Sequence, residues 1–218
     1  NWNKPTLNRL IITGLDDNVK DGDIPMILVT GNPQSLDTPY DDLEDIDVAD
    51  VAFQNLDNDN AGYSLTPISN NLLEGGNSAY FTIVLDASPL SIVQFSITAN
   101  DSSEAILAGG YDQITFSNSN WNVPQRIYVN SVDDFEIDGD QISIINVAVN
   151  STSDSLFASL SDKSIVVTTE DNDAAGVIIT TGDPLTSEDG ETGFFEIQLK
   201  TKPTAPVSIF FESSNSLE

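Results

Sequence analysis

The segment from Ser131 to Gln141, SVDDFEIDGDQ, is rich in side chains that bind metal ions. It places five carboxylates within eight residues, and Gly139 allows a tight backbone turn between the last two aspartates. Closely spaced carboxylates repel one another unless a cation lies among them, and Ca²⁺ takes about six to eight oxygen ligands from such loops. The segment therefore predicts a calcium-binding loop. Its candidate ligands are Asp133, Asp134, Asp138 and Asp140.

The same spacing recurs near the start of the chain, in the segment GLDDNVKDGD. Its candidate ligands are Asp16, Asp17, Asp21 and Asp23. The short segments DNDNAG and DNDAAG and two glutamates beside glycine-containing turns add Asp57, Asp59, Asp171, Asp173, Glu74 and Glu188. The alternative is an acidic surface that keeps a protein of a saline habitat soluble. Because the clusters recur together at similar spacing, we favour Ca²⁺ binding.

The composition excludes several other functions. Thirty-five acidic and seven basic residues give a net charge of -28, which disfavours nucleic acid and anionic membranes as partners. The absence of cysteine and histidine removes disulfides, zinc and copper sites, and the usual general base. No apolar run is long enough for membrane insertion, and no signal peptide opens the chain. We expect a soluble chain, with any export signal or anchor outside this sequence.

Internal repetition accounts for the recurring loops. The acidic loops are 117 residues apart, and the DND segments are 114 residues apart. The segment from Leu72 aligns without gaps with that from Thr186, which places Glu74 over Glu188. We therefore divide the chain into three parts. Residues 1–62 are the C-terminal part of one repeat, 63–176 a complete repeat, and 177–218 the N-terminal part of the next.

The two partial repeats are complementary. Glu218 aligns with Glu104, so the two fragments together lack only the counterpart of residues 105–119. This pattern resembles a window cut from a longer tandem array. The expected partners are therefore neighbouring repeats of the same chain, or other copies of the chain that associate head to tail through the partial repeats. Folding back within one chain is the alternative.

Short alternating segments predict an all-β protein. They recur between clusters of Gly, Asn, Asp and Ser, about seven to each repeat, and no useful helical periodicity interrupts them. Tandem immunoglobulin-like β-sandwiches are the expected fold. The apolar phase slips by one residue in the strand from Ile142, which predicts a β-bulge. The expected strands include residues 80–85, 93–98, 113–116, 126–129, 142–149, 165–169, 195–199 and 207–211.

The ordered motifs LEGG, NWNxPQ, VDDxxxDGD and DND-x-AG together resemble the Calx-β family, in the tandem form of large bacterial surface proteins. The resemblance implies a β-sandwich that binds several Ca²⁺ at one end, as in the sodium-calcium exchangers. It also implies ligand roles for Glu74, for the acidic loop and for the triplet Asp171, Asn172 and Asp173. Asn172 departs from the acidic pattern of the family. The loop with Asp101, Glu104 and Asp112 matches it poorly.

Together these observations predict a function. Turns at one end of a sandwich can bring Glu74, the 133–140 loop and the DND segment together, and the DND segment also links two repeats. Ca²⁺ bound there would fix the angle between repeats. We therefore expect a structural or adhesive module of a large secreted or cell-surface bacterial protein or filament.

The sequence leaves three alternative functions open. A carbohydrate-binding module would use Tyr40, Tyr111 or Trp121, and a calcium-sensing regulatory domain would resemble that of the exchangers. An enzyme is disfavoured, because the acids lie in repeated loops and no nucleophile with a base partner is evident. Asn100 and Asn150 match the glycosylation sequon, a pattern that is frequent by chance.

Overall fold

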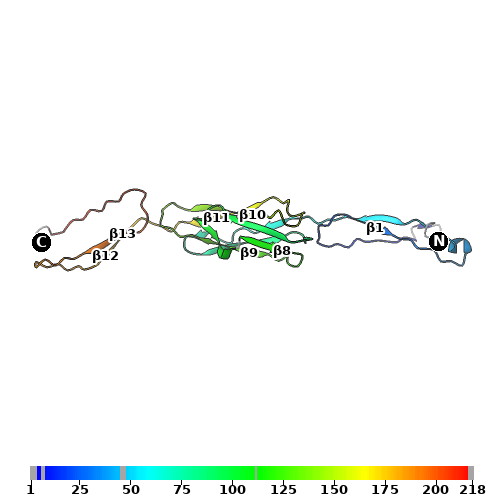
Figure 1. Cartoon of the computed structure of the whole chain (residues 1–218), viewed down its shortest axis with the longest axis horizontal. Coiled ribbons are helices and arrows are strands. Elements are labelled where there is room, and N and C mark those ends of the chain that lie inside the picture. Colours follow the sequence, from blue (N-terminus) through cyan, green and yellow to red (C-terminus); the bar gives the residue numbers. More distant parts are fainter. Residues whose placement is uncertain (1–3, 6–7, 45–47, 111, 216–218) are drawn as a thin grey trace.

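The computed structural model describes residues 4–5, 8–44, 48–110 and 112–215. This part of the chain is all-β and elongated, with a central two-layer sandwich between two β-hairpins (Figure 1). Trp2, Tyr111 and Glu218, which the sequence analysis singled out, lie outside the described residues. The strands are β1 (Ile24–Leu28), β2 (Val51–Asn55), β3 (Tyr63–Leu65), β4 (Leu72–Leu73), β5 (Ser78–Leu85), β6 (Val93–Ala99), β7 (Ala105–Leu107), β8 (Gln113–Phe116), β9 (Gln125–Ser131), β10 (Gln141–Val149), β11 (Lys163–Glu170), β12 (Val177–Thr181) and β13 (Phe195–Leu199). Two short helical elements accompany them, α1 (Thr38–Asp41) and the 3₁₀ turn η3 (Ala108–Gly110).

The central sandwich confirms the predicted fold class. One layer has the strand order β4-β11-β10-β6-β8, and the other has β3-β5-β9-β7. All neighbours are antiparallel except β4 and β11, which run parallel. In β5 the side chains of Ala79, Phe81, Ile83 and Leu85 are buried, and those between them are half-buried. This alternation arises because successive side chains of a strand point to opposite faces, and one face covers the core.

Edge-to-face aromatic contacts join the two layers. The Phe95 ring lies 4.9 Å from that of Tyr63 and 5.9 Å from that of Phe116, with interplanar angles of 68° and 83°. All three are buried. The Tyr63 hydroxyl lies 3.1 Å from the carbonyl oxygen of Val147 and 3.0 Å from that of Ser161. These contacts link β3 of one layer to β6 and β10 of the other, so the core holds the sandwich together.

The flanking hairpins reproduce strand pairs of the central sandwich. Ile24 pairs with Asn55 in β1–β2, and the residues 117 and 114 positions later, Gln141 and Thr169, pair in β10–β11. In the same way β12–β13 has the register of β3–β5. Each hairpin therefore corresponds to part of a different layer. Most of their apolar side chains are exposed, and Phe195 is 51% exposed although the aligned Phe81 is fully buried.

Two local expectations are wrong. The register of β10 with β11 is continuous from Gln141 to Val147, so the predicted bulge is absent. Ser143 occupies the inward position, and Ile142 and Ile144 face outward, which explains the apparent slip of phase. Residues 207–211 form no strand. The aligned strand β6 pairs with β10 and β8, and the C-terminal hairpin carries no counterpart of either strand.

Candidate metal centre

Three connections meet at one end of the central sandwich. The turn after β4 carries Glu74, the β9–β10 loop carries the 133–140 acids, and the segment after β11 carries Asp171 and Asp173. Parallel pairing of Leu73 with Glu170 brings the first and third connections together. Gly75 makes the turn possible with a φ of 58°, and a Cβ atom there would lie 2.7 Å from Asp133 Oδ1. A larger residue at this position would therefore disturb the site.

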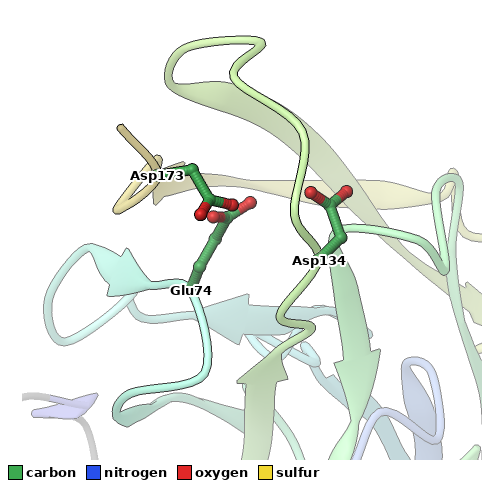
Figure 2. Close-up of side chains that lie close together, drawn as sticks. All are labelled: Glu74, Asp134 and Asp173. Carbon is green, nitrogen blue, oxygen red and sulfur yellow. The ribbon is translucent and has the colours of Figure 1, made fainter. Parts of the chain in front are cut away.

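Three carboxylates converge between these connections. Ligand oxygens of Glu74, Asp134 and Asp173 all lie within 4.8 Å of one another (Figure 2). Glu74 is buried, only 4% exposed, and the two aspartates are half-buried. Among the described residues no other group of three or more acidic side chains is this close. An oxygen-only set of this kind suits a hard cation such as Ca²⁺.

Glu104 is a fourth carboxylate near this group, and it was absent from the predicted ligands. It is only 7% exposed. Burial raises its pKa, and the negative charges of Asp138, Glu74, Asp101 and Asp134 raise it further. Its Oε2 atom has no hydrogen-bond partner in the described part of the chain. A buried, unpartnered carboxylate oxygen among other acids is costly unless a cation neutralises it. We call Glu74, Glu104, Asp134 and Asp173 the acidic cluster.

Like charges within the acidic cluster repel one another. Burial raises the pKa of Glu74, and the charges of Asp134, Asp171 and Asp173 raise it further against one backbone hydrogen bond. The pKa of Asp173 is raised in the same way, by burial and then by neighbouring aspartates including Asp171 and Asp133. Its Oδ2 atom is buried and lacks a partner among the described residues. A cation at this position would relieve both effects.

Other predicted ligands hold the loops in place. Asp171 Oδ2 accepts a hydrogen bond from the Gly139 amide at 2.8 Å, and its Oδ1 accepts one from the Asp173 amide at 2.7 Å. The Asp171 amide donates to Asp140 Oδ1 at 3.3 Å. Hydrogen bonds from the Asp173 and Gly139 amides lower the pKa of Asp171 despite some burial. Asp171 and Asp140 therefore connect the acidic loop to the linker.

The hydrogen bonds of Asn172 account for an amide at the middle position of the triplet 171–173. Its Nδ2 donates hydrogen bonds to the Glu74 carbonyl oxygen at 2.8 Å and to Asp133 Oδ1 at 3.3 Å. Its backbone amide lies 3.4 Å from Glu74 Oε2. An aspartate at this position has no hydrogen to donate. The asparagine thus links the glutamate turn to the acidic loop without adding another negative charge.

The N-terminal acidic loop has the same backbone arrangement. Asp57 accepts hydrogen bonds from the amides of Gly22 at 2.6 Å and Asp59 at 2.8 Å, and its own amide donates to Asp23 at 3.0 Å. These bonds correspond one for one to those of Asp171 with Gly139, Asp173 and Asp140. A cavity of about 290 Å³ lies here. Its lining includes the predicted ligands Asp16, Asp17, Asp21, Asp57 and Asp59.

Each acidic loop also contacts the following strand pair. The Ser88 amide donates to the Asn18 carbonyl oxygen at 2.6 Å, and the Lys202 amide donates to the Phe135 carbonyl oxygen at 2.7 Å. We define the N-terminal junction as residues 14–23, 56–62 and Ser88. The C-terminal junction comprises residues 131–140, 170–176 and Lys202. The junctions therefore share both their internal and their crossing hydrogen bonds.

The remaining candidates lie apart from the acidic cluster. Glu188 is exposed in the turn between β12 and β13, and the structure does not bring it together with another predicted ligand. Of the candidate sugar-binding aromatics, Trp121 packs against the core and Tyr40 is exposed in α1. Neither position indicates a ligand for Trp121 or Tyr40. No helix in the described ranges has the length and apolar character needed to cross a membrane.

Comparisons with known proteins give distant structural similarity only. No protein-family model matches the chain, and no curated protein matches it. Among solved structures, the chain is similar to "Crystal structure of the S-layer protein SbsC domains 4 and 5". The TM-score is 0.30 and the sequence identity 9%, and the match covers 56% of this chain and 58% of that one.

Proposed function

We propose that the acidic cluster binds Ca²⁺ and that the bound ion stiffens the C-terminal junction. The observation that carries the proposal is the buried, unpartnered Glu104 oxygen beside three converging carboxylates. Every candidate ligand is an oxygen, which favours Ca²⁺ over zinc or copper. Glu74, Asp134 and Asp173 would hold the ion, and Glu104 and Asp138 would extend the set.

The location of the acidic cluster relates ion binding to the orientation of the linker. Asp173 belongs to the segment that continues directly into β12, whereas Glu74 and Glu104 belong to the central sandwich. An ion shared by these residues would hold the linker in one orientation, because it binds the ordered junction better than a mobile one. We therefore propose a calcium-stiffened structural or adhesive repeat of the Calx-β type, in a bacterial extracellular or cell-surface protein or filament.

Calcium titration and hydrogen exchange test this proposal together. Calorimetry should detect Ca²⁺ binding to the 218-residue chain. Amide exchange in residues 170–176 should be slow with Ca²⁺ and at least about tenfold faster with chelator, since local opening then needs less free energy. Exchange in the β6–β8 pair, at the opposite edge of its sheet from β4 and β11, serves as the internal control. Absence of calorimetric binding, or equal exchange in both conditions, would contradict the proposal.

A further inference from the structure

One of the differences between the two acidic loops places a basic residue in the N-terminal loop. The sequence GLDDNVKDGD places Lys20 where SVDDFEIDGD places Ile137. Lys20 Nζ forms an ion pair with Asp57 Oδ2 at 3.1 Å, and the Asp57 side chain is only 3% exposed. Ile137 is half exposed and carries no charge. The N-terminal junction therefore contains a positive charge that the C-terminal junction lacks at the aligned position.

The lysine changes the electrostatics of its junction. Burial raises the pKa of Asp57, but hydrogen bonds from Gly22, Asp59 and Lys20 outweigh this effect and lower it. At the C-terminal junction Lys202 pairs with Glu136, a residue outside the acidic cluster, and both side chains are largely exposed. The Lys20 charge thus acts on Asp57 and Asp59, the counterparts of Asp171 and Asp173. In the described part of the chain no lysine or arginine forms an ion pair with a member of the acidic cluster, although the charge of Asp134 contributes to a raised pKa of Lys202.

We propose that the Lys20 ammonium takes the place of a divalent cation and keeps the N-terminal junction ordered without Ca²⁺. This inference rests on the proposed calcium dependence of the C-terminal junction. The shared hydrogen bonds of the two junctions support it, since the same backbone arrangement is retained with Lys20 paired to Asp57 in one case and with no ion pair to the acidic cluster, among the described residues, in the other. The chain would then combine one calcium-independent and one calcium-dependent junction.

Hydrogen exchange in the whole chain tests this difference. In chelator, residues 56–62 of the wild type should stay protected while residues 170–176 exchange faster. Lys20→Ile, which copies the residue at the C-terminal junction, should speed exchange in residues 56–62 at least about tenfold, and added Ca²⁺ should restore protection. Lys20→Arg retains the charge and should behave as the wild type. The reciprocal Ile137→Lys should make residues 170–176 less sensitive to chelator.

The outcomes separate the two proposals. A wild type with no calcium response at residues 170–176 contradicts the proposed function. A wild type that responds there, with Lys20→Ile unchanged at residues 56–62, overturns the role of Lys20 alone. Loss of protection in Lys20→Ile that Ca²⁺ does not restore also overturns it, because the lysine would then be a packing residue rather than a substitute cation.

Discussion

Glu104 has opposite effects on folding and on the proposed ion binding. Its buried carboxylate lies among like charges, so the charge destabilises the metal-free fold, yet the same oxygens are available to Ca²⁺. Glu104→Gln should therefore stabilise the metal-free chain by about 1 kcal/mol. It should also weaken Ca²⁺ binding at least about tenfold. Urea unfolding in chelator and calorimetry measure the two effects.

Glu188→Gln is the matched control for this prediction. Glu188 aligns with Glu74 in the sequence but is exposed in the β12–β13 turn. Its replacement should leave both the unfolding free energy and the calcium affinity unchanged. A Glu104→Gln variant that is destabilised in chelator would contradict the assignment of Glu104 as an uncompensated charge.

The raised pKa values predict how stability depends on pH. Glu74, Glu104 and Asp173 have pKa values above their ordinary values, so the folded metal-free chain binds more protons than the unfolded one as pH falls toward these values. Its stability should consequently rise as pH falls from neutral toward about 5, the sign opposite to that of an acid-labile ion pair. Asp171 and Asp57 have lowered pKa values and oppose this trend only in more acidic solution.

Urea unfolding in chelator between pH of about 5 and about 7 measures this effect. Saturating Ca²⁺ should reverse the slope in the same range, because protons then compete with the ion for the carboxylates. A metal-free chain that loses stability over this range as pH falls would contradict the pKa assignments.

The sequence predicts the cluster only in part. Charge density and spacing identify Glu74, Asp134 and Asp173, whose convergence follows from turns at one end of a sandwich. Glu104 was not among the predicted ligands, because its loop, which the sequence analysis named, matches the acidic motifs poorly. The supporting role of Asp171 was also hidden, since composition alone does not distinguish a carboxylate that accepts amide hydrogen bonds from one that faces a metal.

At the scale of the elements, the buried side chains of β6 contribute to the stability of the sandwich. Phe95 is fully buried and contacts Tyr63 in the opposite layer and Phe116 in its own. Phe95→Ala should destabilise the sandwich by about 3–5 kcal/mol, through lost contacts and the cavity left behind. Phe210 is 92% exposed, and Phe210→Ala is expected to change stability by less than about 0.5 kcal/mol. Urea unfolding followed by tryptophan fluorescence compares them, and equal effects would contradict the described core.

The alternation of apolar and polar residues predicts a strand well where neighbouring strands are present to pair with it. Residues 93–98 and 207–211 are both predicted strands, yet only the first, part of β6, finds partners on both sides. Propensity therefore decides where a strand is permitted, and pairing decides whether it forms. The bulge prediction failed for a related reason, because the sequence did not show that Ser143 would face the core and two isoleucines would face outward.

At the scale of the whole molecule, the exposed faces of the hairpins predict association. β1–β2 corresponds to a strand pair of one layer and β12–β13 to a pair of the other, and their apolar residues remain exposed. We expect the 218-residue chain to associate head to tail, with β1–β2 of one copy covering β12–β13 of another. Phe195→Asp should disrupt this packing by placing a charge in the apolar face.

Sedimentation over a range of protein concentrations measures the association. The wild type should form concentration-dependent chains of particles, and Phe195→Asp should remain a monomer. Glu196→Gln alters the adjacent residue of β13, whose side chain points to the opposite face, and should associate as the wild type does. A wild type that sediments as a monomer at all concentrations would contradict this prediction.

The paired amide contacts of Ser88 with Asn18 and of Lys202 with Phe135 have a geometric consequence. Equivalent junctions relate each sandwich to the next by the same rotation and the same translation. Any longer succession of sandwiches with these junctions would form a regular superhelix, with a pitch fixed by backbone hydrogen bonds. Exposed side chains at each turn of that superhelix would then face outward at a constant spacing.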